Sequence, residues 1–202
     1  MAAAAACVDP KNLWTFSLLR KRRAALQSRA ANWNAVPGLM PDRTAHPMCD
    51  SLMARALALS LQNVRSGRGG PFGAVIARGG EIIAEGTNCV TATNDPTAHA
   101  EMMAIREACR KLQRFELPDC EIYSSCEPCP MCLGAIYWAR PARVYFANSA
   151  ADAAQAGFDD AFIYQELGLA HAERKIPMIQ LTQEDAAAAF RAWREKSDKI
   201  RY

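Results

Sequence analysis

Apolar and polar positions change period several times along the chain, and these changes predict its elements. From residue 48 to residue 64, apolar side chains recur at helical spacing, which predicts a first helix. Two short runs rich in β-branched residues, 72–78 and 81–90, are separated by a Gly-Gly pair and predict a β-hairpin. A polar loop follows, and the apolar spacing of residues 98–112 predicts a second helix.

The second half of the chain continues this alternation. Residues 120–125 and 143–148 predict two further strands, and the apolar run after Pro130 predicts a buried helix between them. The remaining patterns indicate mixed helix and turn, a fifth strand and a closing amphipathic helix, at residues 152–167, 176–182 and 184–199. Strands that alternate with helices predict an α/β fold in which helices cover a sheet.

The first 47 residues differ in composition from the rest. Residues 1–47 open on an alanine run and carry seven Lys or Arg against two acidic residues, whereas residues 48–202 carry 17 against 19. We expect a basic, poorly ordered extension at 1–47 and the catalytic domain at 48–202. Because that domain has no basic surplus, it lacks the charge that nucleic-acid binding needs, and we expect no nucleic-acid partner.

The chain also lacks the signals of secretion and membrane insertion. Its N-terminal stretch has no uninterrupted apolar core before a cleavage site, and no window is long and apolar enough to span a bilayer. Three of the eight cysteines crowd together, which is typical of a metal or redox site in a reducing compartment. We therefore expect a cytoplasmic protein without a membrane partner.

Two short motifs carry the candidate chemistry. His99 and Glu101 form H-A-E near the start of one predicted helix, and Cys129 and Cys132 lie in P-C-P-M-C near the start of another. One imidazole and two thiolates supply the three protein ligands of a catalytic Zn²⁺ and leave a position for water. Glu101 is spaced to take a proton from that water and to deliver it to a ring nitrogen and a leaving amine. H-x-E followed by P-C-x-x-C is the signature of zinc deaminases that act on bases.

A non-catalytic zinc site is the alternative interpretation. Cys126 lies three residues before Cys129 and, as a fourth ligand, would close the site and make the metal structural. We expect it to be a non-ligand, since a closed site would leave Glu101 without a task. The other cysteines and histidines lack ligand spacing and are expected to be incidental thiols and solvated side chains: Cys7, Cys49, Cys89, Cys109, Cys120, His46 and His171.

From residue 48 to residue 202 the chain resembles the bacterial guanine deaminases of the cytidine-deaminase-like superfamily. The resemblance rests on GGPFGAVI, DPTAHAEMMAIREAC, SCEPCPMCLGAIYWAR, AGFDDAFIYQEL, FRAWR and the terminal RY. It implies a three-layer α/β/α sandwich with a five-stranded mixed sheet, Zn²⁺ held by His99, Cys129 and Cys132, and Glu101 as proton shuttle. The implied reaction is the hydrolysis of guanine to xanthine and ammonia.

The same resemblance implies a substrate site and a partner. Asn88, Asp160 and Tyr202 correspond to family residues that hold the purine or relay protons, and the family forms homodimers with a swapped C-terminal segment. Phe72 and Trp138 are candidates to stack on a purine ring, although aromatics beside apolar runs are often core. The substrate alternatives are another purine base or nucleoside, such as adenine or guanosine, and adenosine in tRNA.

Overall fold

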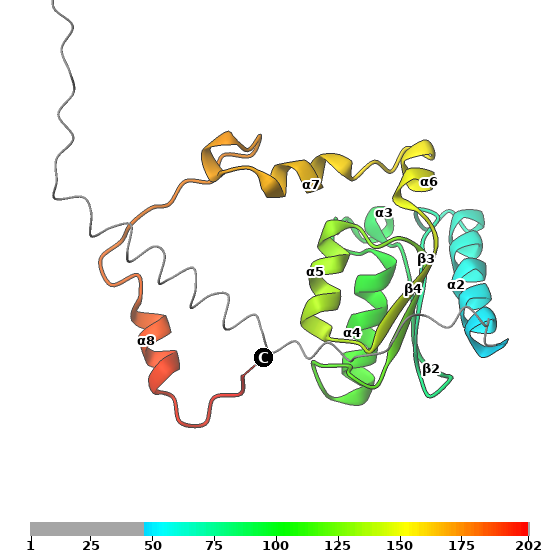
Figure 1. Ribbon diagram of the computed structural model, residues 1–202, viewed down its shortest axis with the longest axis horizontal. Coiled ribbons are helices and arrows are strands. Elements are labelled where there is room, and N and C mark those ends of the chain that lie inside the picture. Colours follow the sequence, from blue (N-terminus) through cyan, green and yellow to red (C-terminus); the bar gives the residue numbers. More distant parts are fainter. Residues whose placement is uncertain (1–46, 202) are drawn as a thin grey trace, which may run out of the picture. The chain divides into compact units, whose positions relative to one another are not determined.

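A computed structural model describes residues 47–201 of the chain (Figure 1). In chain order its elements are α2 (Pro47–Arg65), β1 (Gly73–Arg78), β2 (Glu81–Thr87), α3 (Val90–Thr93), α4 (Ala100–Leu112), β3 (Glu121–Cys126), α5 (Pro130–Ala139), β4 (Arg143–Asn148), α6 (Ala150–Gln155), α7 (Ala161–Gly168), the 3-10 helix η3 (His171–Glu173) and α8 (Ala188–Glu195). Within this part of the chain no helix has both the length and the apolar character that a membrane crossing requires.

The strands form one mixed sheet in the order β2-β1-β3-β4. The hairpin β1–β2 and the pair β1–β3 are antiparallel, whereas β3 and β4 are parallel. Gly79 and Gly80 both have positive φ and form the predicted hairpin turn. Parallel neighbours need a crossover, which α5 provides. Figure 1 shows α2 on one face of the sheet and α4 and α5 on the other, so the predicted three-layer α/β/α fold is confirmed.

Successive side chains of β1 point to opposite faces of the sheet and pack into two separate cores. Val75 and Ala77 face α2, where they pack with apolar side chains of that helix and with Tyr123 of β3. Ala74 and Ile76 point to the other face and pack under α4 and α5. The sheet is thus buried on both sides at its centre, and this fixes the helices whose N-termini carry the candidate motifs.

The structure differs from the sequence-based expectations in three places. The prediction of a fifth strand at 176–182 is wrong, because the described sheet has four strands and this segment lies outside it. Its side chains Ile176, Ile179 and Leu181 are 79%, 79% and 77% exposed, so within residues 47–201 the segment has neither a paired strand nor a core to hold it as a strand. The second predicted strand ends at Thr87 rather than at residue 90, where α3 begins, and the closing helix is shorter than expected.

The predicted extension at residues 1–47 lies outside the described residues except for Pro47, the first residue of α2. Its basic, poorly ordered character and the domain boundary at residue 48 therefore stay predictions.

Gly86 of β2 lies directly against the backbone of α4, and a larger residue at this position should destabilise the packing of β2 on α4. A Cβ atom there would lie 2.1 Å from the carbonyl oxygen of Ala100 and 2.6 Å from the backbone nitrogen of Ala104. We expect Gly86→Ala to lower the free energy of unfolding by about 1–3 kcal/mol or more, because the backbone of α4 must move. Chemical denaturation measures the change.

Gly134 offers the matched control on α5. Nothing lies within 4 Å of a Cβ built at this position, and the residue is inside a helix. Gly134→Ala should therefore raise the free energy of unfolding by up to about 1 kcal/mol. Equal stability changes of the same sign in the two variants would contradict the close packing of β2 on α4.

Candidate active site

Two helix N-termini meet at the end of β3 and present the candidate metal ligands. His99 is the N-cap residue of α4, and Cys129 is the N-cap residue of α5, with Pro130 at the first helical position. Neither side chain caps its own helix by a hydrogen bond, so both are available for another partner. Cys132 lies one turn into α5 and is fully buried.

The three side chains converge on one point. His99 Nδ1 lies 3.4 Å from Cys129 Sγ and 3.6 Å from Cys132 Sγ, and the three ligand atoms lie within 4.8 Å of one another. A tetrahedral Zn²⁺ with usual bond lengths separates a sulfur ligand from a nitrogen ligand by about 3.5 Å. The soft donor set and its spacing therefore fit zinc. Cys126, by contrast, directs its Sγ to the carbonyl oxygen of Ser149 (3.5 Å).

The charges around this group favour a thiolate. The pKa of the Cys129 thiol is lowered, because it accepts a hydrogen bond from Cys132 and, to a smaller extent, because of His99. The hydrogen bond with Cys129 in turn raises the pKa of His99. Both cysteines also lie at the N-terminal end of α5, Cys129 as its N-cap and Cys132 in its first turn, where the helix dipole stabilises negative charge. Thiolate is the form that binds a metal.

Glu101 is an acidic residue that lies beside this group. It lies in the first turn of α4 and is only 6% exposed. Ser124 of β3 donates a hydrogen bond to its Oε1 (3.1 Å), and its Oε2 lies 3.5 Å from Cys132 Sγ. Burial raises the pKa of the Glu101 carboxyl, which suits a group that must both take and release a proton near neutral pH.

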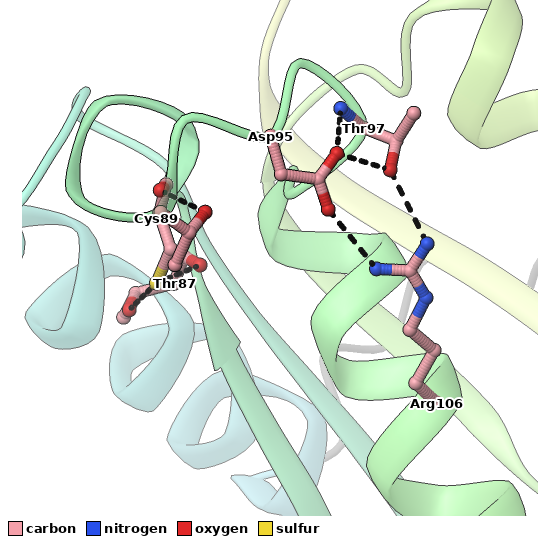
Figure 2. A network of polar contacts seen from close by, with 6 residues as sticks. Thr87, Cys89, Asp95, Thr97 and Arg106 are labelled. Atoms are coloured by element: carbon pink, nitrogen blue, oxygen red, sulfur yellow. Dashed lines mark hydrogen bonds and ion pairs between the residues drawn. The ribbon is translucent and has the colours of Figure 1, made fainter.

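A polar network fixes the loop that leads into His99 (Figure 2). Asp95 Oδ1 accepts hydrogen bonds from the backbone N–H (2.8 Å) and the hydroxyl (2.7 Å) of Thr97. Arg106 reaches back from α4 to Thr97 Oγ1 (3.2 Å) and to Asp95 (3.8 Å). At the other end of the loop, Cys89 N–H donates to the carbonyl oxygen of Ala98 (2.9 Å). These hydrogen bonds thereby fix the positions of the residues at the two ends of the loop, Asn88 and His99, relative to each other.

A pocket of about 250 Å³ opens beside Glu101 and the ligand group. Its lining residues are Phe72, Asn88, His99, Glu101, Cys126, Glu127, Cys129, Ala150, Ala153, Gly157, Phe158, Asp159 and Asp160. This lining, drawn from the described residues, includes four carboxylates and no Lys or Arg. Such a site suits a ligand that offers several N–H groups.

Three of the predicted substrate residues line this pocket. Phe72 meets Phe158 edge to face, with ring centroids 5.0 Å apart. Asn88 follows the last residue of β2 and accepts backbone N–H groups with its Oδ1. Asp160 makes no capping hydrogen bond at α7, and burial raises the pKa of its carboxyl. Its neighbour Asp159 accepts the backbone N–H of Ala161 instead (2.9 Å).

Of the other two predicted substrate residues, the structure describes only Trp138, and this residue does not line the pocket. Trp138 is 63% exposed and is absent from the pocket lining, because α5 buries Cys132, Ile136 and Ala139 on its inner face. The expectation that its ring stacks on the substrate has no support from this geometry. Tyr202 lies outside the described residues.

Several residues of the site were not predicted from the sequence, among them Glu127, Asp159, Phe158 and Ser124. Phe158 lies within the segment AGFDDAFIYQEL, and an aromatic beside the acidic pair was a signal that could have been weighed. Ser124 gave no signal, because a serine in the middle of a strand does not reveal which side chain of a neighbouring helix it faces.

An α/β/α sandwich with a His–Cys–Cys group at two helix N-termini and a buried glutamate beside it defines the class of zinc-dependent base deaminases. A family model described as the cytidine and deoxycytidylate deaminase zinc-binding region matches residues 48–148. The chain belongs to this family.

Individual relatives agree with this assignment. The guanine deaminase of Bacillus subtilis (strain 168) is 54% identical over 76% of this chain and 98% of its own length, and the crystal structure of the B. subtilis enzyme superposes with a TM-score of 0.74. A structure of a guanine deaminase from Nitrosomonas europaea is 34% identical over 57% of this chain and 66% of its own, with a TM-score of 0.53. The tRNA-specific adenosine deaminase of Aquifex aeolicus (strain VF5) is 50% identical over 38% of this chain and 50% of its own length.

Proposed function

We propose that this protein hydrolyses guanine to xanthine and ammonia. The observation that carries the proposal is the buried Glu101 beside the His99–Cys129–Cys132 group, in a chain that is 54% identical to a guanine deaminase over 98% of that enzyme. The pocket beside Glu101 has room for a small ligand and carries carboxylates that can accept the N–H groups of a guanine ring.

His99, Cys129 and Cys132 hold a zinc ion in this proposal. When bound, the ion would supply Lewis acidity that lowers the pKa of a water molecule to near neutral. The side chains prepare the site for it, since both N-cap residues leave their own helices uncapped and the pKa of Cys129 is already lowered.

Glu101 moves the protons of the reaction. Its carboxylate accepts a proton from the attacking water and delivers it to the ring nitrogen N3 of guanine, next to C2. After the water oxygen has bonded to C2, Glu101 takes the remaining proton from this oxygen and transfers it to the amine, and the C2–N bond breaks. The oxygen becomes the C2 carbonyl of xanthine, and the amine leaves as ammonia. The hydrogen bond from Ser124 to Oε1 keeps the carboxylate in place between these atoms.

The pocket walls orient the base. Phe72 and Phe158 provide aromatic surface for the ring, and Asn88 offers its amide N–H to an acceptor of the purine. Asp160 accepts an N–H of the base with a carboxylate that no helix cap occupies. Together these contacts select a planar ring with donors along one edge.

A panel of substrates tests this proposal. Purified protein is incubated with guanine, adenine, guanosine, cytosine and an adenosine-containing tRNA stem-loop, and ammonia release is followed. We expect kcat/KM for guanine to exceed the others by at least about 100-fold, because a site built to hydrogen-bond one edge leaves buried groups unpaired with the wrong ring. Turnover of a cytosine compound or of tRNA alone would overturn the proposal.

The partner in this proposal is a second copy of the chain. Beyond α6 the described residues form no buried core, and they expose apolar side chains on α7, on α8 and between them: Phe162, Tyr164, Leu167, Ile176, Ile179, Leu181, Phe190 and Trp193. Contiguous exposed apolar surface is typical of sites that bind another protein. A homodimer in which residues 161–202 of each copy cover the other would bury these side chains and bring Tyr202 to the neighbouring pocket.

Tags at the two ends of the chain test this arrangement. Light scattering should give a mass of two chains for the untagged protein. A bulky domain fused after Tyr202 should lower kcat/KM by at least about 10-fold, the value of one lost hydrogen-bonding contact, whereas the same domain before Met1 should have little effect. Equal rates for both fusions would remove Tyr202 from the site. The cytoplasmic location belongs to the same proposal, since the ligand thiols need a reducing compartment.

A further inference from the structure

Asn63 is a buried polar residue that the proposed mechanism does not use. It lies near the end of α2, whose other buried side chains are Leu52, Ala56 and Leu59, and it is only 3% exposed. Its Nδ2 donates two hydrogen bonds, to the carbonyl oxygens of Gly70 (2.9 Å) and Asn88 (2.8 Å). A buried amide with two short bonds to distant segments fixes those segments relative to each other.

Both segments form the wall of the pocket. The segment around Gly70 leads into Phe72, and Asn88 itself lines the pocket. Their backbones are in direct contact, because a Cβ at Gly69 would lie 2.2 Å from the carbonyl oxygen of Asn88. Asn88 N–H also donates to the carbonyl oxygen of Phe72 (3.2 Å). Asn63 therefore joins the two segments from behind.

The contact between these two segments determines which atom of the Asn88 side chain is left to bind a ligand. Asn88 Oδ1 accepts the N–H groups of Gly70 (3.4 Å) and Val90 (3.3 Å). With the oxygen engaged by the backbone, the Nδ2 group is left to bind a ligand in the pocket. The bond from Gly70 exists only while Gly70 stays beside Asn88, and the two bonds from Asn63 hold it there.

We propose that Asn63 is a positioning residue, which holds the Gly70 and Asn88 backbones together so that the Asn88 amide presents its N–H to a hydrogen-bond acceptor of the purine ring. The inference rests on the proposed function, since it takes Asn88 as a substrate contact. It adds a residue of α2 to the groups that determine selectivity for the base.

A double-mutant cycle in kcat/KM for guanine tests the inference. Asn63→Ala should lower kcat/KM by about 10-fold in the wild-type background, the value of one hydrogen bond to the substrate. In the Asn88→Ala background the same change should lower it less than about 2-fold, because the amide through which Asn63 acts is gone. Asn63→Ser keeps one donor, should show an intermediate loss, and serves if Asn63→Ala does not fold.

Ser60 provides the matched control. It lies one turn earlier on α2, and its Oγ donates a hydrogen bond to the carbonyl oxygen of Pro71 (2.6 Å), in the same loop, rather than to Asn88. Ser60→Ala should change the melting temperature, as Asn63→Ala does, yet leave kcat/KM within about 2-fold in both backgrounds. A loss of catalysis in this variant would show that loop stability alone matters and would overturn the inference.

The outcomes separate the two proposals. If the wild-type protein does not deaminate guanine, the proposed function fails and the inference fails with it. If Asn88→Ala keeps the wild-type kcat/KM while guanine is turned over, the role of Asn88 is wrong and the inference is overturned alone. Equal losses from Asn63→Ala in both backgrounds would also overturn only the inference.

Discussion

Glu101→Gln should lower kcat for guanine by about 10²–10⁴-fold while the protein keeps its zinc. The amide has the size of the carboxyl and can still accept the hydrogen bond from Ser124, but it cannot take a proton from water. Because burial raises the pKa of Glu101, the variant also lacks a charge that is costly to bury, and its melting temperature should be no lower than that of the wild type. Ammonia release, metal analysis and calorimetry measure the three quantities.

Glu107→Gln is the control on the same helix. Glu107 is half-buried on α4, pairs with Arg110 and does not line the pocket. Its variant should keep kcat and metal content. If Glu101→Gln retained full activity, another group would have to carry the protons, and the assignment of Glu101 would fall.

Cys132→Ser should remove both the zinc and the activity. Cys132 is fully buried in the first turn of α5, and its sulfur lies 3.6 Å from His99 Nδ1. A hydroxyl is a poor replacement for a thiolate ligand, and even partners of metal ligands cost 10–100-fold when changed, so we expect a loss of more than about 100-fold in kcat/KM. Chelation of the wild-type protein should have the same effect and be reversed by added Zn²⁺.

Cys126→Ser distinguishes an open site from a closed one. Cys126 is also buried, but its sulfur faces the carbonyl oxygen of Ser149. If three residues hold the metal, this variant keeps one zinc per chain and most of its activity. If it loses zinc as completely as Cys132→Ser, four protein ligands fill the coordination sphere, and the catalytic role of the metal is wrong.

The candidate metal ligands could be predicted from the sequence because their two motifs lie at the starts of helices. His99 and Cys129 are both N-cap residues, and H-A-E and P-C-P-M-C indicate such positions through the proline and the onset of apolar runs. Glu101 and Cys132 then follow within the first turn, so their position is determined by helix geometry alone. The alternation of strand and helix patterns predicted a sheet covered by helices, and the three layers were implied by the family resemblance.

Features that depend on contacts between distant segments could not be predicted from the sequence. The run after Pro130 is apolar on all sides, so its period does not reveal that Ile136 faces inward while Trp138 is exposed. Residues 176–182 have strand-like composition, but a strand also needs a neighbour, and none lies beside them within the described chain. Asn63 gave no signal for the same reason, because its two partners lie in other segments.

The carboxylates around the pocket also disfavour the binding of nucleotides. A nucleotide carries negative charge on its phosphates, and the described residues that line the pocket include the carboxylates of Glu127, Asp159 and Asp160 and no Lys or Arg. Such a juxtaposition of like charges costs several kcal/mol, about 10³-fold or more in affinity. A protein that hydrolyses the free base would therefore not deaminate GTP or the other guanine nucleotides.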